Sequence, residues 1–263
     1  MNSISDFHPI TALIQLIKTL RDKENGCPWD KKQNFETIAP YTIEEAYEVL
    51  DAITSKDHKA LKAELGDLLF QIVFQSELAS EENLFEFNDV VVGITKKMIE
   101  RHPHIFKKED IQPEVIEKTW EKIKTEERRH NHDYKSSLDG IAKALPALLR
   151  AQKIQNRSAN HGFDWNNAEP VFDKVLEELD EIRIEVKNRN QEGIKEEIGD
   201  LLFTCVNLAR HLGVDSENAL RSANEKFVKR FQLMEEKLKT LDKTFRDFKE
   251  KEMETLWSQT KNN

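Results

Sequence analysis

Two pairs of acidic residues, each with a spacing of three, are the residues best suited to chemistry. Glu45 and Glu48 form the first pair, and Glu64 and Asp67 form the second. Side chains at i and i+3 of a helix project from the same face, about one turn apart. Four carboxylates held together repel one another, and a bound dication would remove that repulsion. Oxygen ligands favour Mg²⁺, with Mn²⁺ as a possible substitute, over zinc, so the pattern predicts a magnesium site.

The same acids occur again 133 residues later in the chain. Over the thirty positions from 44 to 73, eleven residues are identical to their counterparts, where chance would give roughly two. The second set is Glu178, Glu181, Glu197 and Asp200. Shorter segments also match: GCPWD at 26–30 with GFDWN at 162–166, Lys97 and Arg101 with Lys226 and Arg230, and Trp120 with Trp257. The chain therefore holds two copies of one module.

Helices are expected to position these acids. Glycine (8) and proline (7) are scarce and charged residues make up 34% of the chain, which suits long exposed helices. The segment TSKDHK at 54–59 suits a turn, so the helices around it should run antiparallel with their acids at matching height. Apolar residues at spacings of three and four over 61–79 predict one apolar stripe. That stripe consists of Leu61, Leu65, Leu68, Leu69, Ile72 and Val73.

The sequence predicts an all-α protein made of two tandem four- or five-helix bundles. The first copy is expected over 1–125 and the second over 139–263. A charged linker is expected over 126–138, where apolar periodicity is missing. Pro40 and Pro170 are expected near helix starts, where the missing N–H of proline costs nothing.

Composition excludes several other functions. The net charge of −9, with both signs interleaved, argues against direct nucleic-acid binding, which would need a basic face. A membrane span would need an apolar run of roughly 18 residues, and the chain has none. Cys27 and Cys205 lack metal-ligand spacing and do not suggest a disulfide framework. With no signal peptide at the N-terminus, a cytoplasmic protein is expected.

The acidic pairs and the histidine-containing segments also allow other interpretations. Acidic pairs also occur on solvated helix faces, and Thr42 with Glu45 could form a capping box. A di-iron site would need an inward Glu-x-x-His on each of two helices, and this chain has one, from Glu127 to His130. His102-Pro-His104 and His130-x-His132-Asp133 are expected to be surface histidines, because positions two apart on a helix point in different directions. Duplication of the acidic pattern favours a metal site.

The pattern EExxE, a gap and then ExxD resembles the all-α nucleoside triphosphate pyrophosphohydrolases. Two copies of it, together with GCPWD at 26–30, RHPHIF at 101–106 and RAQKIQ at 150–155, resemble the MazG family in particular. The resemblance covers nearly the whole chain. It implies magnesium-dependent cleavage between the α- and β-phosphates of a nucleoside triphosphate, giving a monophosphate and pyrophosphate. It also implies helical bundles paired as homodimers, with active sites near the subunit contacts.

The resemblance also assigns roles to residues of the second copy. Glu178, Glu181, Glu197 and Asp200 match metal ligands, and Glu177 or Glu178 would accept the proton of the attacking water. The chemistry requires mainly positioning and charge neutralisation. The residues implied in substrate binding are Lys174, Glu177, Glu178, Glu196, Lys226, Arg230 and Trp257. Lys174 and Trp257 have plain structural alternatives, as a helical ion pair and as a core or interface tryptophan.

The two copies differ at positions expected to bind phosphate. Lys174 has Tyr41 as its counterpart, and Glu196 has Ala63. The C-terminal copy is therefore expected to be the main catalytic site, and the N-terminal copy to be weaker or to serve dimerisation. Broad nucleotide specificity is expected, because stacking on a tryptophan tolerates any base. The alternatives are a non-catalytic nucleotide- or metal-binding regulator or scaffold, and a dedicated dUTPase or phosphoribosyl-ATP pyrophosphohydrolase.

Overall fold

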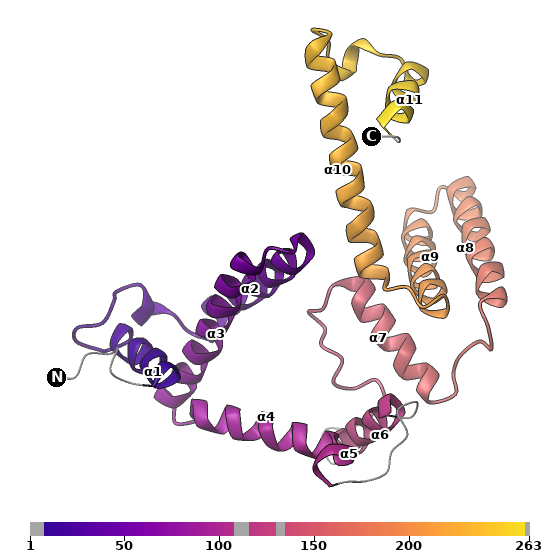
Figure 1. Cartoon of the computed structure of the whole chain (residues 1–263). Coiled ribbons are helices and arrows are strands. Elements are labelled where there is room, and N and C mark those ends of the chain that lie inside the picture. Colours follow the sequence, from indigo (N-terminus) through magenta and orange to yellow (C-terminus); the bar gives the residue numbers. More distant parts are fainter. Residues whose placement is uncertain (1–7, 108–115, 130–134, 261–263) are drawn as a thin grey trace. The chain divides into compact units, whose positions relative to one another are not determined.

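The computed structural model describes residues 8–107, 116–129 and 135–260, and every regular element within these ranges is a helix (Figure 1). The all-α prediction is confirmed for this part of the chain. The chain divides into two compact units, residues 1–124 and 125–263. Each unit contains one pair of long helices that carries the acidic residues of the repeat.

The N-terminal unit is built around the pair α2 and α3. Its elements are α1 (Pro9–Leu20), a 3₁₀ turn (Asp30–Lys32), α2 (Phe35–Ser55), α3 (His58–Glu81), α4 (Phe87–Arg101), the short α5 (Pro103–Phe106) and most of α6 (Ile116–Arg129). Helix α3 packs against α1, α2 and α4. The core lies where α1, α2 and α3 meet and contains Ile17, Ile38, Val73, Phe74 and Leu78.

The C-terminal unit is built around the pair α8 and α9. Its elements are α7 (Ala147–Asn160), α8 (Glu169–Asn188), α9 (Gln191–His211), α10 (Ser216–Thr240), a 3₁₀ turn (Phe245–Asp247) and α11 (Glu250–Gln259). Helix α9 packs against α7, α8 and α10, and α11 packs on α10. A small core between α10 and α11 contains Met234, Leu238 and Leu256.

Both long pairs are closed by the same two-residue turn. Lys56 and Arg189 end the first helix of each pair in the left-handed region, with φ of 58° and 56°. Asp57 and Asn190 then cap the second helix by accepting hydrogen bonds from backbone N–H groups of its first turn. A turn this short forces the helices to lie side by side and antiparallel, as expected from the TSKDHK segment.

The start of α2 differs from the expected arrangement. Pro40 lies inside α2, one and a half turns from its start, whereas Pro170 is at the start of α8 as expected. The capping box is formed by Asn34 and Thr37, whose side chains each bond the other's backbone N–H at 2.9 Å. The capping role considered for Thr42 is wrong, because its Oγ1 accepts a 2.6 Å hydrogen bond from Gln75 of α3.

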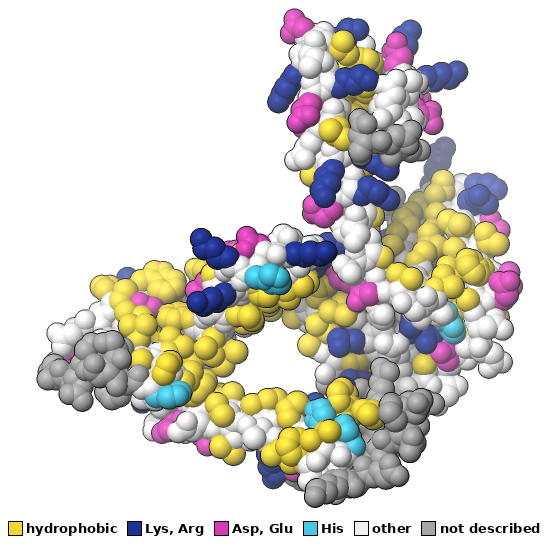
Figure 2. Space-filling view, viewed as in Figure 1, with side chains coloured by type: hydrophobic (Ala, Val, Ile, Leu, Met, Phe, Trp, Pro, Cys, Tyr) yellow, Lys and Arg dark blue, Asp and Glu magenta, His cyan; other side chains and the backbone are white. Residues whose placement is uncertain are grey.

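The apolar stripe of α3 is only partly buried. Val73 is in the core, but Leu65, Leu69 and Ile72 are exposed. Their counterparts on α9 are also exposed: Ile198, Leu202 and Cys205. Hydrophobic side chains are visible on the surface of both units (Figure 2). The periodicity therefore predicted the helices correctly, but part of each stripe faces outward within its own unit.

The segment expected to be a linker begins as a helix. Helix α6 continues to Arg129, so residues 126–129 belong to it. Ile116, Trp120 and Ile123 lie at spacings of four and three and give α6 one apolar face, and residues 126–129 extend the helix because Glu and Arg are good helix formers. Residues 130–134 of the expected linker, with His130, His132 and Asp133, lie outside the described residues.

Candidate metal and nucleotide site

Each unit brings three of its four repeated acids together. In the N-terminal unit, Glu45 and Glu48 on α2 and Glu64 on α3 each offer a carboxylate oxygen within 4.8 Å of the others. In the C-terminal unit, Glu178 on α8 and the pair Glu197 and Asp200 on α9 do the same. We call these groups the N-terminal and C-terminal acidic clusters. The turn that closes each helix pair places the acids of both helices at the same height.

The fourth acid of each set lies beside its cluster. Asp67 is outside the N-terminal trio, yet its charge contributes to raising the pKa of both Glu45 and Glu64. Glu181 is outside the C-terminal trio, yet its charge contributes to raising the pKa of Glu197. The sequence predicted four equivalent ligands, and the structure distinguishes three clustered acids from one neighbour in each unit.

The carboxylates in both clusters oppose one another electrostatically. Partial removal from water, followed by the charges of Asp67 and Glu48, raises the pKa of Glu45 above its ordinary value. The same causes, with Glu48 and Asp67 as neighbours, raise the pKa of Glu64. Removal from water and then the charges of Glu181 and Glu178 raise the pKa of Glu197. A hard dication would relieve this repulsion, and an all-oxygen donor set fits one.

Lys174 lies beside the C-terminal acidic cluster, whereas its counterpart in the N-terminal unit is Tyr41. Lys174 Nζ lies 2.8 Å from Glu177 Oε1 and 2.9 Å from Glu178 Oε1. Hydrogen bonds to Glu177 and then Glu178 raise the pKa of Lys174, so the ammonium stays charged. The Glu178 side chain is only 4% exposed, and this contact offsets the cost of burying its charge. The ion pair considered from the sequence is thus present.

The counterpart of Lys174 takes part in a different contact. Tyr41 packs edge-on against Trp29, with ring centroids 6.0 Å apart. Both rings are exposed, Trp29 by half of its surface. At the position where the C-terminal unit has the ammonium group of Lys174, the N-terminal unit therefore has Tyr41, which is paired with another aromatic ring.

The other residues implied in substrate binding lie outside the two clusters. Glu177 and Glu196 are exposed on α8 and α9. Lys226 is exposed on α10, and the Arg230 guanidinium lies over the Trp257 ring, 5.5 Å from its centroid. Trp257 also packs against Phe227 at 5.2 Å and borders the small core between α10 and α11. Its structural role is therefore visible, and its nucleotide contact stays a prediction.

The histidines and cysteines of the described residues belong to neither cluster. His102 Nδ1 lies 2.6 Å from the Met98 carbonyl, and the ring packs on Trp120 with centroids 4.8 Å apart. Cys27 and Cys205 are both free thiols. Within the described ranges, the two acidic clusters are the groups of three or more potential ligands that come together.

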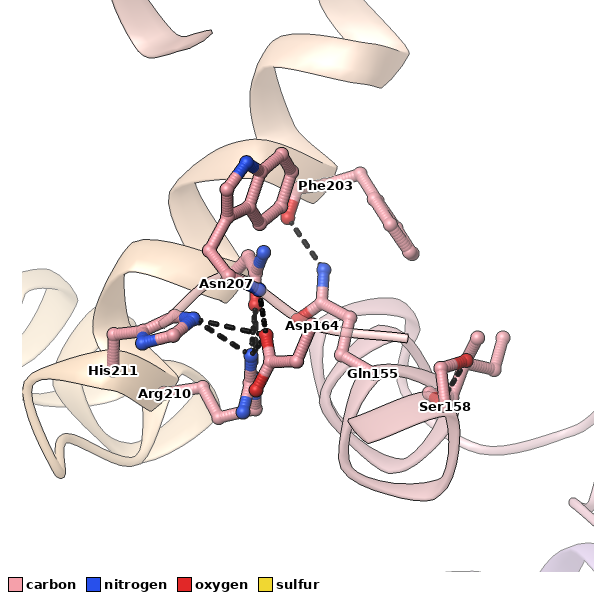
Figure 3. Close-up of polar contacts among 9 residues, drawn as sticks. Gln155, Ser158, Asp164, Phe203, Asn207, Arg210 and His211 are labelled. Atoms are coloured by element: carbon pink, nitrogen blue, oxygen red, sulfur yellow. Dashed lines mark hydrogen bonds and ion pairs between the residues drawn. The ribbon is translucent and has the colours of Figure 1, made fainter. Parts of the chain in front are cut away.

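One polar network of the C-terminal unit was not predicted from the sequence. Asp164, Asn207, Arg210 and His211 join the loop between α7 and α8 to the end of α9 (Figure 3). The match of GFDWN with GCPWD predicted a loop at this place. Because the match aligns Asp164 with Pro28, it gave no sign that a carboxylate at this position matters. Only the tertiary structure shows that Asp164 has partners 46 and 47 residues away.

Both units of the chain match one known domain family. The MazG nucleotide pyrophosphohydrolase domain matches the chain twice, at residues 33–106 and 167–233, and each range contains one acidic cluster. A nucleoside triphosphate pyrophosphohydrolase of Escherichia coli is 51% identical over 258 residues, covering 96% of this chain and 97% of that relative. The nucleoside triphosphate pyrophosphohydrolase/pyrophosphatase MazG of Thermotoga maritima is 41% identical over 249 residues, covering 95% and 94%.

A longer relative shares the same region. An uncharacterized protein of Bacillus subtilis is 39% identical over 257 residues, covering 97% of this chain but 52% of its own length. Helices that carry paired carboxylate clusters and match the MazG domain twice define the class, and the chain belongs to the MazG family. It has the tandem two-module form of that family. Among the described helices, none is long and apolar enough to cross a membrane.

Proposed function

We propose that the chain hydrolyses nucleoside triphosphates to a nucleoside monophosphate and pyrophosphate, with the C-terminal cluster as the main site. The observation that carries this proposal is the trio of Glu178, Glu197 and Asp200 beside Lys174, inside a range that matches the MazG domain. The E. coli and T. maritima relatives, which match nearly the whole chain, are named for this activity.

We propose Mg²⁺ as the metal, with Mn²⁺ as a substitute. Glu178, Glu197 and Asp200 would hold it, with Glu181 beside them. When bound, the metal would supply charge neutralisation at the phosphates and a lower pKa for an attacking water. Glu177 or Glu178 would accept the proton of that water, since Lys174 lies between these two carboxylates and holds both in place. Lys174 would also bring positive charge toward the triphosphate.

We further propose that α10 and α11 contribute to substrate binding. Lys226 and Arg230 are four positions apart on α10 and share a face, so they would contact the phosphate chain. Trp257, already in contact with Arg230, would stack on the base. Stacking would tolerate different bases, which supports broad specificity for the nucleotide pool. Free nucleotides as substrates also support a cytoplasmic enzyme.

The products of the reaction test this function. Full-length protein with Mg²⁺ and a panel of ribo- and deoxynucleoside triphosphates should release monophosphate and pyrophosphate. EDTA should abolish release, and Mg²⁺ or Mn²⁺ should restore it. Diphosphate and orthophosphate as direct products would overturn the assignment. Binding without release would favour a regulatory or scaffold protein, and turnover of one substrate alone would favour a dedicated dUTPase or phosphoribosyl-ATP enzyme.

We also propose that the chain forms a homodimer through the outward apolar faces of its helix pairs. Leu65, Leu69 and Ile72 on α3 are exposed, and so are the residues at the three matching positions of α9. Exposed apolar patches mark interaction surfaces, and most soluble oligomers are symmetric assemblies of identical chains. Leu65→Glu and Ile198→Glu place a charge on each face. Sedimentation should show a dimer for the wild-type chain and dissociation in one or both variants, and a wild-type monomer would overturn this proposal.

A further inference from the structure

Asp164 connects two segments that meet only in the folded chain. It lies in the loop between α7 and α8, and its Oδ1 is 3.0 Å from His211 Nε2 and is bonded by Arg210 Nη2 (Figure 3). The same oxygen accepts the Trp165 N–H at 2.9 Å. One carboxylate oxygen thus joins the loop that enters α8 to the last two residues of α9.

Arg210 also forms hydrogen bonds within α9, which hold its side chain in position to bond Asp164. Its Nε and Nη2 donate to Asn207 Oδ1 at 2.9 and 2.8 Å, within the same helix. Asn207 is buried, and the side chains of Arg210 and His211 are 13% and 10% exposed. Although removal from water acts in the opposite direction, hydrogen bonds from Arg210 and His211 hold the pKa of Asp164 below its ordinary value. The contact is therefore a partly buried charged network rather than a solvated surface pair.

The position of this network allows it to hold the loop before α8 against the end of α9. Helices α8 and α9 are joined at one end by the turn Arg189–Asn190, and the network joins the last residues of α9 to the loop that precedes α8. Ala168 at the N-cap of α8 has no side chain that could cap the helix, and the Glu169 N–H donates to Asn167 Oδ1 at 3.0 Å instead. Asp200 lies ten residues before Arg210 on α9, or about 15 Å along the helix axis. Glu197 and Asp200 of the C-terminal acidic cluster thus lie on α9 between the Arg189–Asn190 turn and the Asp164 network.

We propose that Asp164, Arg210 and His211 are positioning residues that set the register of Glu178 opposite Glu197 and Asp200, and so the affinity of the C-terminal cluster for a divalent cation. The inference rests on the proposed metal site. In the N-terminal unit Pro28, Glu77 and Leu78 occupy the matching positions. A different residue makes the corresponding connection there, because Arg21 bonds the Glu81 carboxylate at the end of α3 at 2.7 Å and the Asp30 and Gln33 carbonyls of the loop before α2. There Glu77 lies 3.9 Å from Lys18 instead, and Leu78 is in the core.

A calorimetric titration of Mn²⁺ into the metal-free full-length chain measures the Kd for the cation and tests the inference without relying on activity. Asp164→Ala should raise the Kd of the C-terminal site several-fold, less than the roughly tenfold or larger loss expected for a residue bonded directly to a metal ligand. His211→Ala should also raise it. His211→Gln, which keeps a side-chain N–H donor, should stay closer to the wild type. Asp180→Asn, an exposed carboxylate on α8, is the matched control and should leave Kd unchanged.

Thermal melts separate positioning from simple stabilisation. If Asp164→Ala is unfolded at the assay temperature, Asp164→Asn carries the same test, because it removes the charge and keeps the shape. Variants that melt earlier but bind Mn²⁺ with the wild-type Kd would overturn the positioning role while leaving the proposed function intact. A wild-type chain that binds no Mn²⁺ would overturn the metal site, and this inference with it.

Discussion

The two acidic clusters share their carboxylate spacing and differ in what compensates their charge. Glu178 is buried and contacts Lys174. Its counterpart Glu45 is only half-buried, and Tyr41 stands in the N-terminal unit at the position that corresponds to Lys174. A buried carboxylate that contacts a fixed cation is held in one place. Duplication thus preserved the carboxylate pattern, while a lysine in contact with it is present in the C-terminal copy.

The largest expected effect comes from removing the same carboxylate in each cluster. Glu197→Gln and Glu64→Gln are equivalent changes at equivalent positions. Glu197→Gln should lower pyrophosphate release by roughly a hundredfold or more, because a bound metal supplies several kcal/mol of charge stabilisation. Glu64→Gln should have a small effect. Steady-state pyrophosphate release measures both, with thermal melts to confirm folding.

The outcome decides between the two modules. Equal losses for Glu197→Gln and Glu64→Gln would mean that both sites work or that they are coupled. A severe loss for Glu64→Gln alone would reverse the assignment of the main site. The helix itself should tolerate either change, because Gln is about as good a helix former as Glu.

The next effect concerns the cation. Lys174→Met would leave the Glu178 carboxylate buried without its partner and should lower the free energy of unfolding by about 2 kcal/mol. Mn²⁺ should recover part of this loss, since a dication would compensate the same carboxylate. Tyr41→Met, the matched change in the other unit, leaves no buried charge and should show no such Mn²⁺-dependent recovery. Denaturant titrations with and without Mn²⁺ measure the difference, and identical losses for the two variants would contradict this account of Lys174.

A smaller effect should be seen in the pH dependence of the metal-free protein. The folded-state pKa of Glu64 is raised above its ordinary value of 4.5, so its contribution to stability is present at low pH and lost as pH rises through the raised pKa. Glu64→Gln imitates the protonated form. In EDTA, the variant should therefore melt increasingly above the wild type as pH rises from about 4 to 7. A constant difference across that range would mean that Glu64 carries no such shift.

The smallest effect is expected at a surface difference between the modules. Asp180 and Arg183 form an exposed ion pair on α8 at 2.6 Å, where the N-terminal unit has Tyr47 and Leu50. Asp180→Asn should change the free energy of unfolding by less than about 0.5 kcal/mol, because exposed pairs contribute little. Denaturant titration checks this value. A larger change would show that the comparison of the two units must include their outer faces.

Helix content, duplication and the candidate ligands were accessible from the sequence because each depends on local spacing. The i, i+3 acids and the TSKDHK turn were sufficient to place Glu45 beside Glu64. Pro40 misled the prediction of the α2 start, because Asn34 and Thr37 form a capping box further upstream. The burial of the α3 stripe was overestimated, because periodicity shows that a face is apolar but not what covers it.

Local patterns of residues were enough to predict an all-α chain with two copies of one carboxylate pattern, since helical periodicity and short turns are properties of neighbouring residues. The tertiary structure decided which acids meet, leaving Asp67 and Glu181 beside the clusters and burying Glu178 next to Lys174. It also decided that Asp164 meets Arg210 and His211 across a separation of 46 and 47 residues. Contacts of this kind depend on how helices pack in three dimensions, and no local pattern in the chain encodes them.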